Sequence, residues 1–201
     1  GGLEGIRAYQ DKTLPEAPKT AIKINKNKVV LPSIDTTPKL YVGGKQKRPD
    51  SGYSFNQMSA QKEFICDIAR ANRKDVRDAV EAASKSKIGI LNNFNRSQIL
   101  FYLAENLSQR KETFVNLLMS ITGVNKITAL KEFEQSCERI FYYASMADKF
   151  EGNIHNPPMR GLTLAVKEPI GIIASLMCEY KPLLSLITTI SSLFANGNAS
   201  L

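Results

Sequence analysis

Four chemically versatile side chains, Cys178, Glu179, Tyr180 and Lys181, follow one another near the end of this 201-residue sequence. A cysteine thiolate is a nucleophile, and a lysine ammonium can pair with a phosphate. The ordinary alternatives are an inert thiol and a solvated surface lysine. Whether this segment binds a ligand therefore depends on the elements that position it.

An apolar run precedes these four residues, and a helical pattern follows them. Residues 170–177 are rich in β-branched side chains and are bounded by Pro169, which predicts a strand buried on both faces. Apolar residues then recur at helical spacing over residues 183–194, and Pro182 suits a first helical turn. The four residues therefore form a turn between a strand and a helix.

Gly197 stands where a left-handed residue would end this helix, and Asn198 starts the exit into another strand. A strand, a helix and a second strand make half of a parallel α/β layer. Ligands in such sheets bind beyond the carboxyl ends of the strands, which here means Met177 to Lys181. The pattern predicts an α/β fold with a ligand-binding turn.

The same stretch does not suit a transmembrane helix, which needs about 20 largely apolar residues. Glu179, Lys181 and Pro182 divide it into two shorter pieces. The sequence also opens without a cationic, apolar, small-residue signal pattern. We expect no membrane span.

The three cysteines, Cys66, Cys137 and Cys178, are widely spaced and form no CxxC pair. With His155 as the one histidine, a zinc site has too few ligands, so we expect no metal. The pattern favours reduced, mostly buried thiols in a cytoplasmic protein. A reactive Cys178 is the alternative.

The net charge of +8 is concentrated in one segment. Residues 19–48 hold eight basic residues and one acidic residue, and therefore carry +7 of it. A basic stripe can attract nucleic acid or anionic lipid. This one has little aromatic interleaving for base stacking and contains several prolines, which favours a solvated linker. We therefore expect no nucleic-acid partner.

The remaining patterns predict short strands and four helices. Strand patterns cover residues 39–45, which run into a glycine turn, and residues 64–69 and 163–166. Asn72 is predicted to cap the first helix and Asn95 the second. Gly123 is predicted to end the third helix, and the fourth, with apolar residues over 127–144, to end near Gly152.

Taken together, these motifs resemble the start of an aldehyde dehydrogenase. The resemblance covers about residues 39–201, and its motifs occur in the family's order. They lie at residues 40–45, 71–80, 96–100, 104–107, 147–152, 168–171, 182–184 and 197–198. The implied fold is the N-terminal part of an aldehyde dehydrogenase with a truncated Rossmann-like cofactor domain.

The opening, Gly1-Gly2-Leu3-Glu4-Gly5 with Tyr9, resembles the closing motif of the same family. An end, a linker and a new beginning would match the tandem, sixteenth class of aldehyde dehydrogenases. We expect residues 1–15 to be the tail of a preceding unit, 16–38 a linker, and 39–201 an incomplete second unit. An added terminal remnant is the alternative for Gly1-Gly2.

The resemblance implies a homo-oligomeric enzyme that oxidises an aldehyde with NAD or NADP. In the family a cysteine attacks the aldehyde, hydride passes to the nicotinamide, and a glutamate activates water. Both residues, and a lysine that contacts the cofactor ribose, belong beyond Leu201, so we predict that this chain alone is inactive. The backbone of Leu176, Met177, Cys178 and Glu179 is expected to line the cofactor cleft.

The family turn reads Pro-Trp-Asn-Phe-Pro, and its Asn donates to the oxyanion. Aligned on Pro182, Tyr180 stands at the Asn position and Glu179 at the Trp position. A phenol places its donor elsewhere, and losing one oxyanion donor costs on the order of 10² to 10³ in rate. Two functions remain open, an NAD(P)-dependent oxidoreductase and a non-catalytic homologue that acts as a scaffold.

Overall fold

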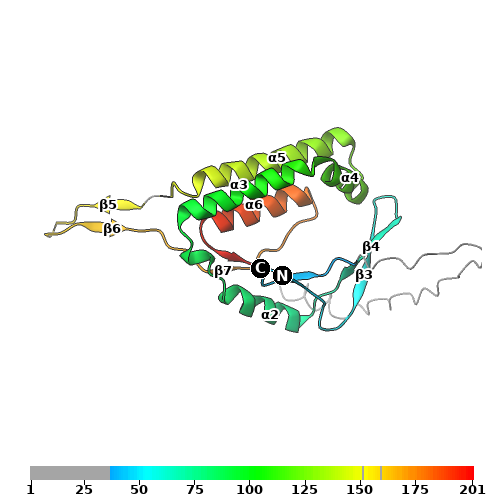
Figure 1. Ribbon diagram of the computed structural model, residues 1–201, viewed down its shortest axis with the longest axis horizontal. Helices are drawn as coiled ribbons and strands as arrows, with labels where there is room; N and C mark the ends of the chain where they lie inside the picture. The colour runs from blue at the N-terminus through cyan, green and yellow to red at the C-terminus, as the bar shows by residue number, and fades with distance from the viewer. Residues whose placement is uncertain (1–36, 151, 159) are drawn as a thin grey trace, which may run out of the picture. The chain divides into compact units, whose positions relative to one another are not determined.

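Pairs of short strands flank and interrupt a set of long helices along the chain (Figure 1). The computed structural model describes residues 37–150, 152–158 and 160–201, so residues 1–36 and the predictions made for them lie outside the described residues. In chain order the elements are β1 (Leu40–Val42), β2 (Lys45–Lys47), β3 (Ser54–Met58), β4 (Phe64–Ala69), α2 (Arg73–Ser84), the 3-10 turn η1 (Ile88–Ile90), α3 (Asn93–Gln109), α4 (Lys111–Thr122), α5 (Lys126–Met146), β5 (Asn153–His155), β6 (Thr163–Ala165), β7 (Ile172–Ile173), α6 (Pro182–Ala195) and β8 (Ala199–Ser200).

The first strands form two antiparallel hairpins, β1 with β2 and β3 with β4. Gly43 and Gly44 make the first turn with φ of 60° and 77°, which a residue with a Cβ adopts only at a cost. The predicted strands over 39–45 and 64–69 are confirmed as β1 and β4, whereas β3 was not predicted.

Helix α2 begins as predicted at Asn72. The Asn72 side chain accepts from the amides of Lys74 and Asp75, and the Asp75 carboxylate accepts from the Asn72 amide, which completes a capping box. The apolar side chains of α2 are only partly buried, because Val76 and Val80 stay exposed.

The core lies among α3, α4, α5 and α6. Small residues at the contacts let the helix backbones approach closely, since Ala104, Ala129 and Ala144 are fully buried. Larger side chains fill the space between them: Leu100, Leu107, Val115, Leu118, Phe133, Ile140, Leu183 and Ile187. The hydroxyl of Ser97 on α3 also donates to the carbonyl of Ala144 on α5 at 2.7 Å.

Near the end of the described chain, β7, α6 and β8 form a βαβ unit. Strands β7 and β8 are parallel, with Ile172 opposite Ala199 and Ile173 opposite Ser200. The predicted half of a parallel α/β layer is therefore confirmed, as are the helix that starts at Pro182 and the left-handed Gly197, whose φ is 76°.

The strand before the turn is much shorter than predicted, and its predicted burial on both faces is wrong. Only Ile172 and Ile173 are in β7, while Ile170 and Leu176 are exposed. Among the described residues β7 pairs with β8 alone, so the rest of the apolar run has no ladder to join. An apolar, β-branched run indicates a tendency to form a strand but cannot supply the neighbours.

Three further details differ from the sequence-based expectations. Helix α3 is capped by Asn92, not Asn95, because the Asn92 side chain accepts from the Asn95 amide at 2.7 Å. Helix α5 ends at Met146, well before Gly152. Cys178 is exposed, and Cys66 and Cys137 are half-buried, so the thiols are free but not mostly buried.

Strands β5 and β6 form an antiparallel hairpin that confirms the predicted strand at 163–166. Both strands are exposed along their whole length. Among the described residues no helix is both long enough and apolar enough to cross a membrane.

Candidate cofactor-binding turn

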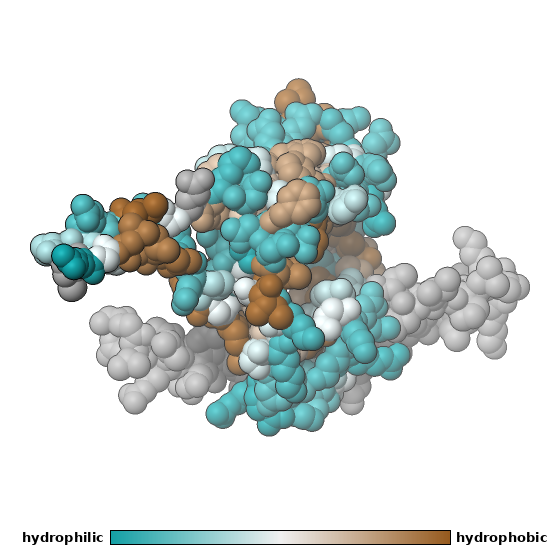
Figure 2. Space-filling model, turned by 60° about the vertical axis from the view of Figure 1, so that its left-hand side comes forward, coloured by the Kyte–Doolittle hydropathy of each residue, from teal (hydrophilic) through white to brown (hydrophobic). Residues whose placement is uncertain are grey.

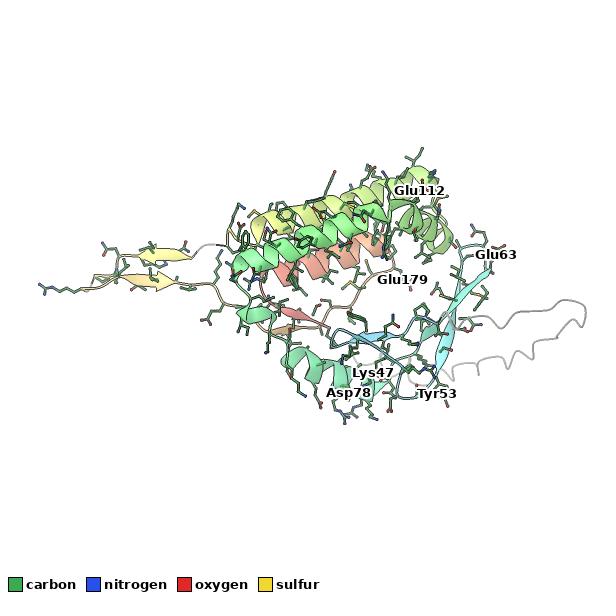
Figure 3. All side chains as sticks on the ribbon, in the orientation of Figure 1. Lys47, Tyr53, Glu63, Asp78, Glu112 and Glu179 are labelled. Atoms are coloured by element: carbon green, nitrogen blue, oxygen red, sulfur yellow. The ribbon has the colours of Figure 1, made fainter. Side chains whose placement is uncertain are left out.

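Residues 174–181 connect the carboxyl end of β7 to the start of α6, and Figure 3 shows Glu179 on this loop beside α6. The predicted site residues Leu176, Met177, Cys178, Glu179 and Tyr180 all lie in it and all are exposed to solvent. The βαβ topology thus brings the predicted residues together at the expected end of the parallel pair.

The turn is folded upon itself. The Cys178 thiol donates to the carbonyl of Tyr180, with Sγ and O 3.2 Å apart, and lies 3.7 Å from the Ser185 hydroxyl. The Lys181 ammonium lies over the Tyr180 ring, 5.7 Å from its centroid. The contact with Ser185 joins the turn to the first helical turn of α6.

Tyr180 points its ring towards solvent, with 77% of the residue exposed. A phenol in this position is open to a ligand that approaches the turn from outside. Its one aromatic contact with a cation is the Lys181 ammonium, and such a contact contributes little when exposed.

The start of α6 is capped by a residue that sequence reasoning missed. The buried carboxylate of Glu132, on α5, accepts hydrogen bonds from the amides of Leu183 and Leu184, at 3.0 and 3.3 Å from Oε1. The only sequence signal is indirect, because neither Lys181 nor Pro182 can cap the helix with its own side chain. That α5 supplies the cap requires the fold.

The carboxyl end of α6 closes on itself. The amide of Gly197 donates to the Phe194 carbonyl and the amide of Asn198 to the Leu193 carbonyl, at 2.9 and 3.0 Å. This is a Schellman motif, which needs a left-handed residue at the position of Gly197. The buried Asn198 side chain then accepts from the amide of Gly171 at 2.9 Å, which holds the approach to β7 against β8.

Arg96, on α3, completes this end. Its Nε donates to the Ala195 carbonyl at 3.2 Å and its Nη1 to the Leu91 carbonyl at 2.6 Å, while Nη2 contacts the Asn93 side chain. Burial lowers the pKa of the Arg96 guanidinium from its ordinary value. An arginine side chain keeps its proton in proteins. The Arg96 guanidinium is therefore charged and faces the negative end of the helix dipole.

A groove with a volume of about 1010 Å³ lies elsewhere in the described part of the chain. It lies between α2, α3 and α6 beside β8, and its apolar lining includes Ile99, Leu103, Ile190 and Phe194. None of residues 176–181 lines it. An apolar groove beside a strand edge is suited to burying hydrophobic segments, whereas the predicted turn is a separate, polar and exposed site.

A βαβ unit with parallel strands is the building block of an α/β, Rossmann-like arrangement. The family model described as the aldehyde dehydrogenase family matches residues 49–201, which is most of the sequence. The chain therefore belongs to the aldehyde dehydrogenase family.

Two curated relatives are formyltetrahydrofolate dehydrogenases. The human mitochondrial 10-formyltetrahydrofolate dehydrogenase is 26% identical over 168 residues, which cover 79% of this chain and 18% of the relative. The mouse cytosolic 10-formyltetrahydrofolate dehydrogenase is 27% identical over 169 residues, covering 79% and 19%. This chain thus spans about a fifth of the length of these relatives.

Solved structures confirm the fold. Betaine aldehyde dehydrogenase from Staphylococcus aureus in complex with NAD+ superposes with a TM-score of 0.79 at 19% identity, over 82% of this chain and 34% of that one. PnpE in complex with nicotinamide adenine dinucleotide gives 0.78 at 25% identity, with the same coverage. The predicted fold class, an aldehyde-dehydrogenase-like N-terminal part with a partial Rossmann-like domain, is correct.

Proposed function

We propose that this chain is part of an NAD(P)-dependent oxidoreductase that converts an aldehyde into an acid, and that the turn at residues 176–179 lines its cofactor cleft. The observation that carries the proposal is the position of this turn at the carboxyl end of β7, within a family member's βαβ unit. Two matched structures with the same fold contain NAD. Residues 176–179 are exposed, and backbone contacts with a dinucleotide would not depend on the family's usual side chains.

The exposed thiol of Cys178 provides a test of cofactor binding. We expect NAD to slow the alkylation of Cys178 in the full-length protein, with Cys66 on β4 as the reference thiol in the same sample. The peptide-resolved alkylation rate is measured by mass spectrometry. Equal protection of both thiols, or none, would count against a cofactor at this turn.

A scaffold without catalysis is the second candidate, and the substituted turn favours it. Tyr180 stands at the position of the family's oxyanion donor, and Glu179 adds a negative charge beside it. Restoring the family residue with Tyr180→Asn separates the two functions. In an enzyme with a weakened oxyanion site, this change raises the rate of aldehyde oxidation; in a scaffold, neither protein turns over aldehyde.

We also propose a domain organisation in which residues 1–15 end a preceding unit, 16–38 form a linker and 39–201 begin a second unit of the tandem class. The share of the relatives that the chain covers supports a larger parent protein. Sequencing the native transcript on both sides tests this. A parent protein without a second family segment upstream would contradict it.

Homo-oligomerisation is the proposed mode of assembly, with cytoplasmic localisation and no nucleic-acid partner. Figure 2 shows apolar side chains gathered on the β5–β6 hairpin, where Ile154, Leu162 and Leu164 are exposed. Within the basic segment 19–48, the Lys47 ammonium pairs with the Asp78 carboxylate at 2.6 Å (Figure 3). Light scattering of the native protein measures the assembly; a monomer at working concentration would refute it.

A further inference from the structure

The first turn of α6 cannot satisfy its own backbone donors. A helix leaves its first amides without intrahelical acceptors. Pro182, at the first helical position, has no amide hydrogen, so the donors left inside the helix are those of Leu183 and Leu184. The preceding residue, Lys181, has no acceptor on its side chain and makes no side-chain cap.

Lys181 also has an unusual backbone conformation, with φ of 47° and ψ of 63°. A left-handed conformation is uncommon for a residue with a Cβ and persists where the surroundings impose it. The chain therefore enters α6 along a path that its own local sequence does not favour. Something outside the turn must hold it there.

Glu132 supplies that contact from α5. Its Oε1 atom accepts from both orphan amides, and only 4% of the residue is exposed. A carboxylate at this position also faces the positive end of the helix dipole. The hydroxyl of Ser136, one turn further along α5, donates to the Glu132 carbonyl at 2.7 Å. The residue is therefore fixed within the α5–α6 contact.

We propose that Glu132 is a positioning residue for the cofactor-binding turn. By holding Leu183 and Leu184, its carboxylate fixes the start of α6 and, through Pro182 and Lys181, the path of residues 176–181. The cofactor part of this inference rests on the proposed function, whereas the positioning of the turn does not.

The capped helix also limits how an anionic ligand can bind. Helix N-termini attract phosphate because their amides are free and the dipole is positive there. In α6 the amides of Leu183 and Leu184 already donate to a carboxylate, so a phosphate would meet a like charge and lack these donors. A dinucleotide at this turn would therefore use the backbone of residues 176–179 and not the helix end.

Three variants of the full chain test the proposal. Glu132→Ala removes the acceptor of both hydrogen bonds. Glu132→Gln keeps a neutral Oε1 acceptor. Glu134→Ala removes an exposed carboxylate two residues along the same helix that pairs with Lys111. The readouts are amide hydrogen exchange at Leu183 and Leu184 and the alkylation rate of Cys178.

We expect Glu132→Ala to accelerate exchange at both leucine amides by about tenfold or more, because each loses a charge-assisted hydrogen bond. We expect the Cys178 alkylation rate to change in the same variant by about threefold or more, since its contacts with Tyr180 and Ser185 depend on the start of α6. Glu132→Gln is expected to produce smaller changes in both rates than Glu132→Ala. Glu134→Ala is expected to leave both rates unchanged.

Exchange and alkylation rates in Glu132→Ala within twofold of the parent would overturn the proposal. If Glu132→Ala unfolds, amide exchange will also be fast at Leu100 in α3, and the test then uses Glu132→Gln. In that variant, intermediate exchange confined to the start of α6 supports the proposal. Exchange at the parent rate refutes it. Adding NAD separates the two claims. A parent whose Cys178 is not shielded by NAD contradicts the cofactor site, while the exchange result still decides the role of Glu132.

Discussion

The two ends of α6 are held by the same electrostatic logic but differ in how open they are. A buried carboxylate, Glu132, faces the amides at its start, and a buried guanidinium, Arg96, faces a carbonyl at its end. Each charge opposes the helix dipole. At the carboxyl end Gly197 and Asn198 are buried, whereas at the amino end residues 176–180 are exposed.

The difference in exposure between the two ends of α6 parallels a difference in how closely each end resembles the family. On the alignment that the resemblance implies, the closed end keeps the family's Gly-Asn pair at Gly197 and Asn198, and the open end departs from the family's turn at Glu179 and Tyr180. A buried site limits substitution by packing, whereas an exposed turn does not. The substituted turn is therefore compatible with an intact fold, and the comparison predicts that changes at the closed end destabilise the protein far more than changes at the open end.

Arg96→Ala is expected to have the largest effect. It leaves the carbonyls of Ala195 and Leu91 without their donor in a buried setting, which costs about 3 to 5 kcal/mol of unfolding free energy. Urea denaturation followed by circular dichroism measures the loss. The control is Arg139→Ala, because Arg139 lies on α5 and is exposed. If Arg96→Ala lowers the unfolding free energy no more than Arg139→Ala does, the predicted difference between the two ends is wrong.

Gly197→Ala is expected to cost about 2 kcal/mol, in two parts. A left-handed alanine is unfavourable by about 1 kcal/mol or more, and its Cβ would lie 2.9 Å from Nη1 of Arg96 and 3.1 Å from Pro169 Cγ. Gly44→Ala separates the two parts, because its φ of 77° is similar and nothing lies within 4 Å of the added Cβ.

Thermal melts of Gly197→Ala and Gly44→Ala measure the two destabilisations directly. The excess destabilisation of Gly197→Ala over Gly44→Ala measures the steric part at the closed end. Equal melting shifts would show that packing around Arg96 and Pro169 relaxes freely, and the closed end would then be less rigid than we infer.

Asn198→Ala is expected to cost about 1 to 2 kcal/mol, because the Gly171 amide loses its acceptor next to the parallel strand pair. Asn196→Ala is the matched control, since Asn196 lies two residues earlier and is exposed. Chemical denaturation of the two variants measures the difference. Equal stabilities would mean that water replaces the Asn198 side chain at no cost.

Tyr180→Asn is expected to change the unfolding free energy by less than about 0.5 kcal/mol, because the ring is exposed and its contact with Lys181 is a weak surface interaction. Differential scanning calorimetry measures this smallest effect. A large loss would show that the fold of the open end depends on its side chains, and would contradict the predicted difference between the two ends.

Local signals in the sequence predicted the elements that they specify. The helix cap at Asn72, the helix end at Gly123 and the two ends of α6 at Pro182 and Gly197 are all present. Each is set by residues a few positions apart, for which side-chain hydrogen bonds and φ preferences suffice. The second helix was assigned the wrong asparagine cap because Asn92, Asn93 and Asn95 offer nearly the same signal.

What the sequence could not predict depends on distant partners. The hydrogen bond from Leu183 to Glu132 joins residues 51 apart, and that from Arg96 to Ala195 joins residues 99 apart. The length of β7 depends likewise on which strands lie beside it. Composition and periodicity carry no information on such pairings, so the candidate turn was located while the residues that hold it were not.

The hold of Glu132 on α6 has a consequence for how this protein can evolve. The start of the helix is anchored from α5 by hydrogen bonds that do not involve the side chains of Cys178, Glu179 and Tyr180. We therefore expect substitutions at these three positions to leave the start of α6 in place. The turn can therefore accumulate new residues, lose an activity or acquire another, while the scaffold beneath it is inherited unchanged.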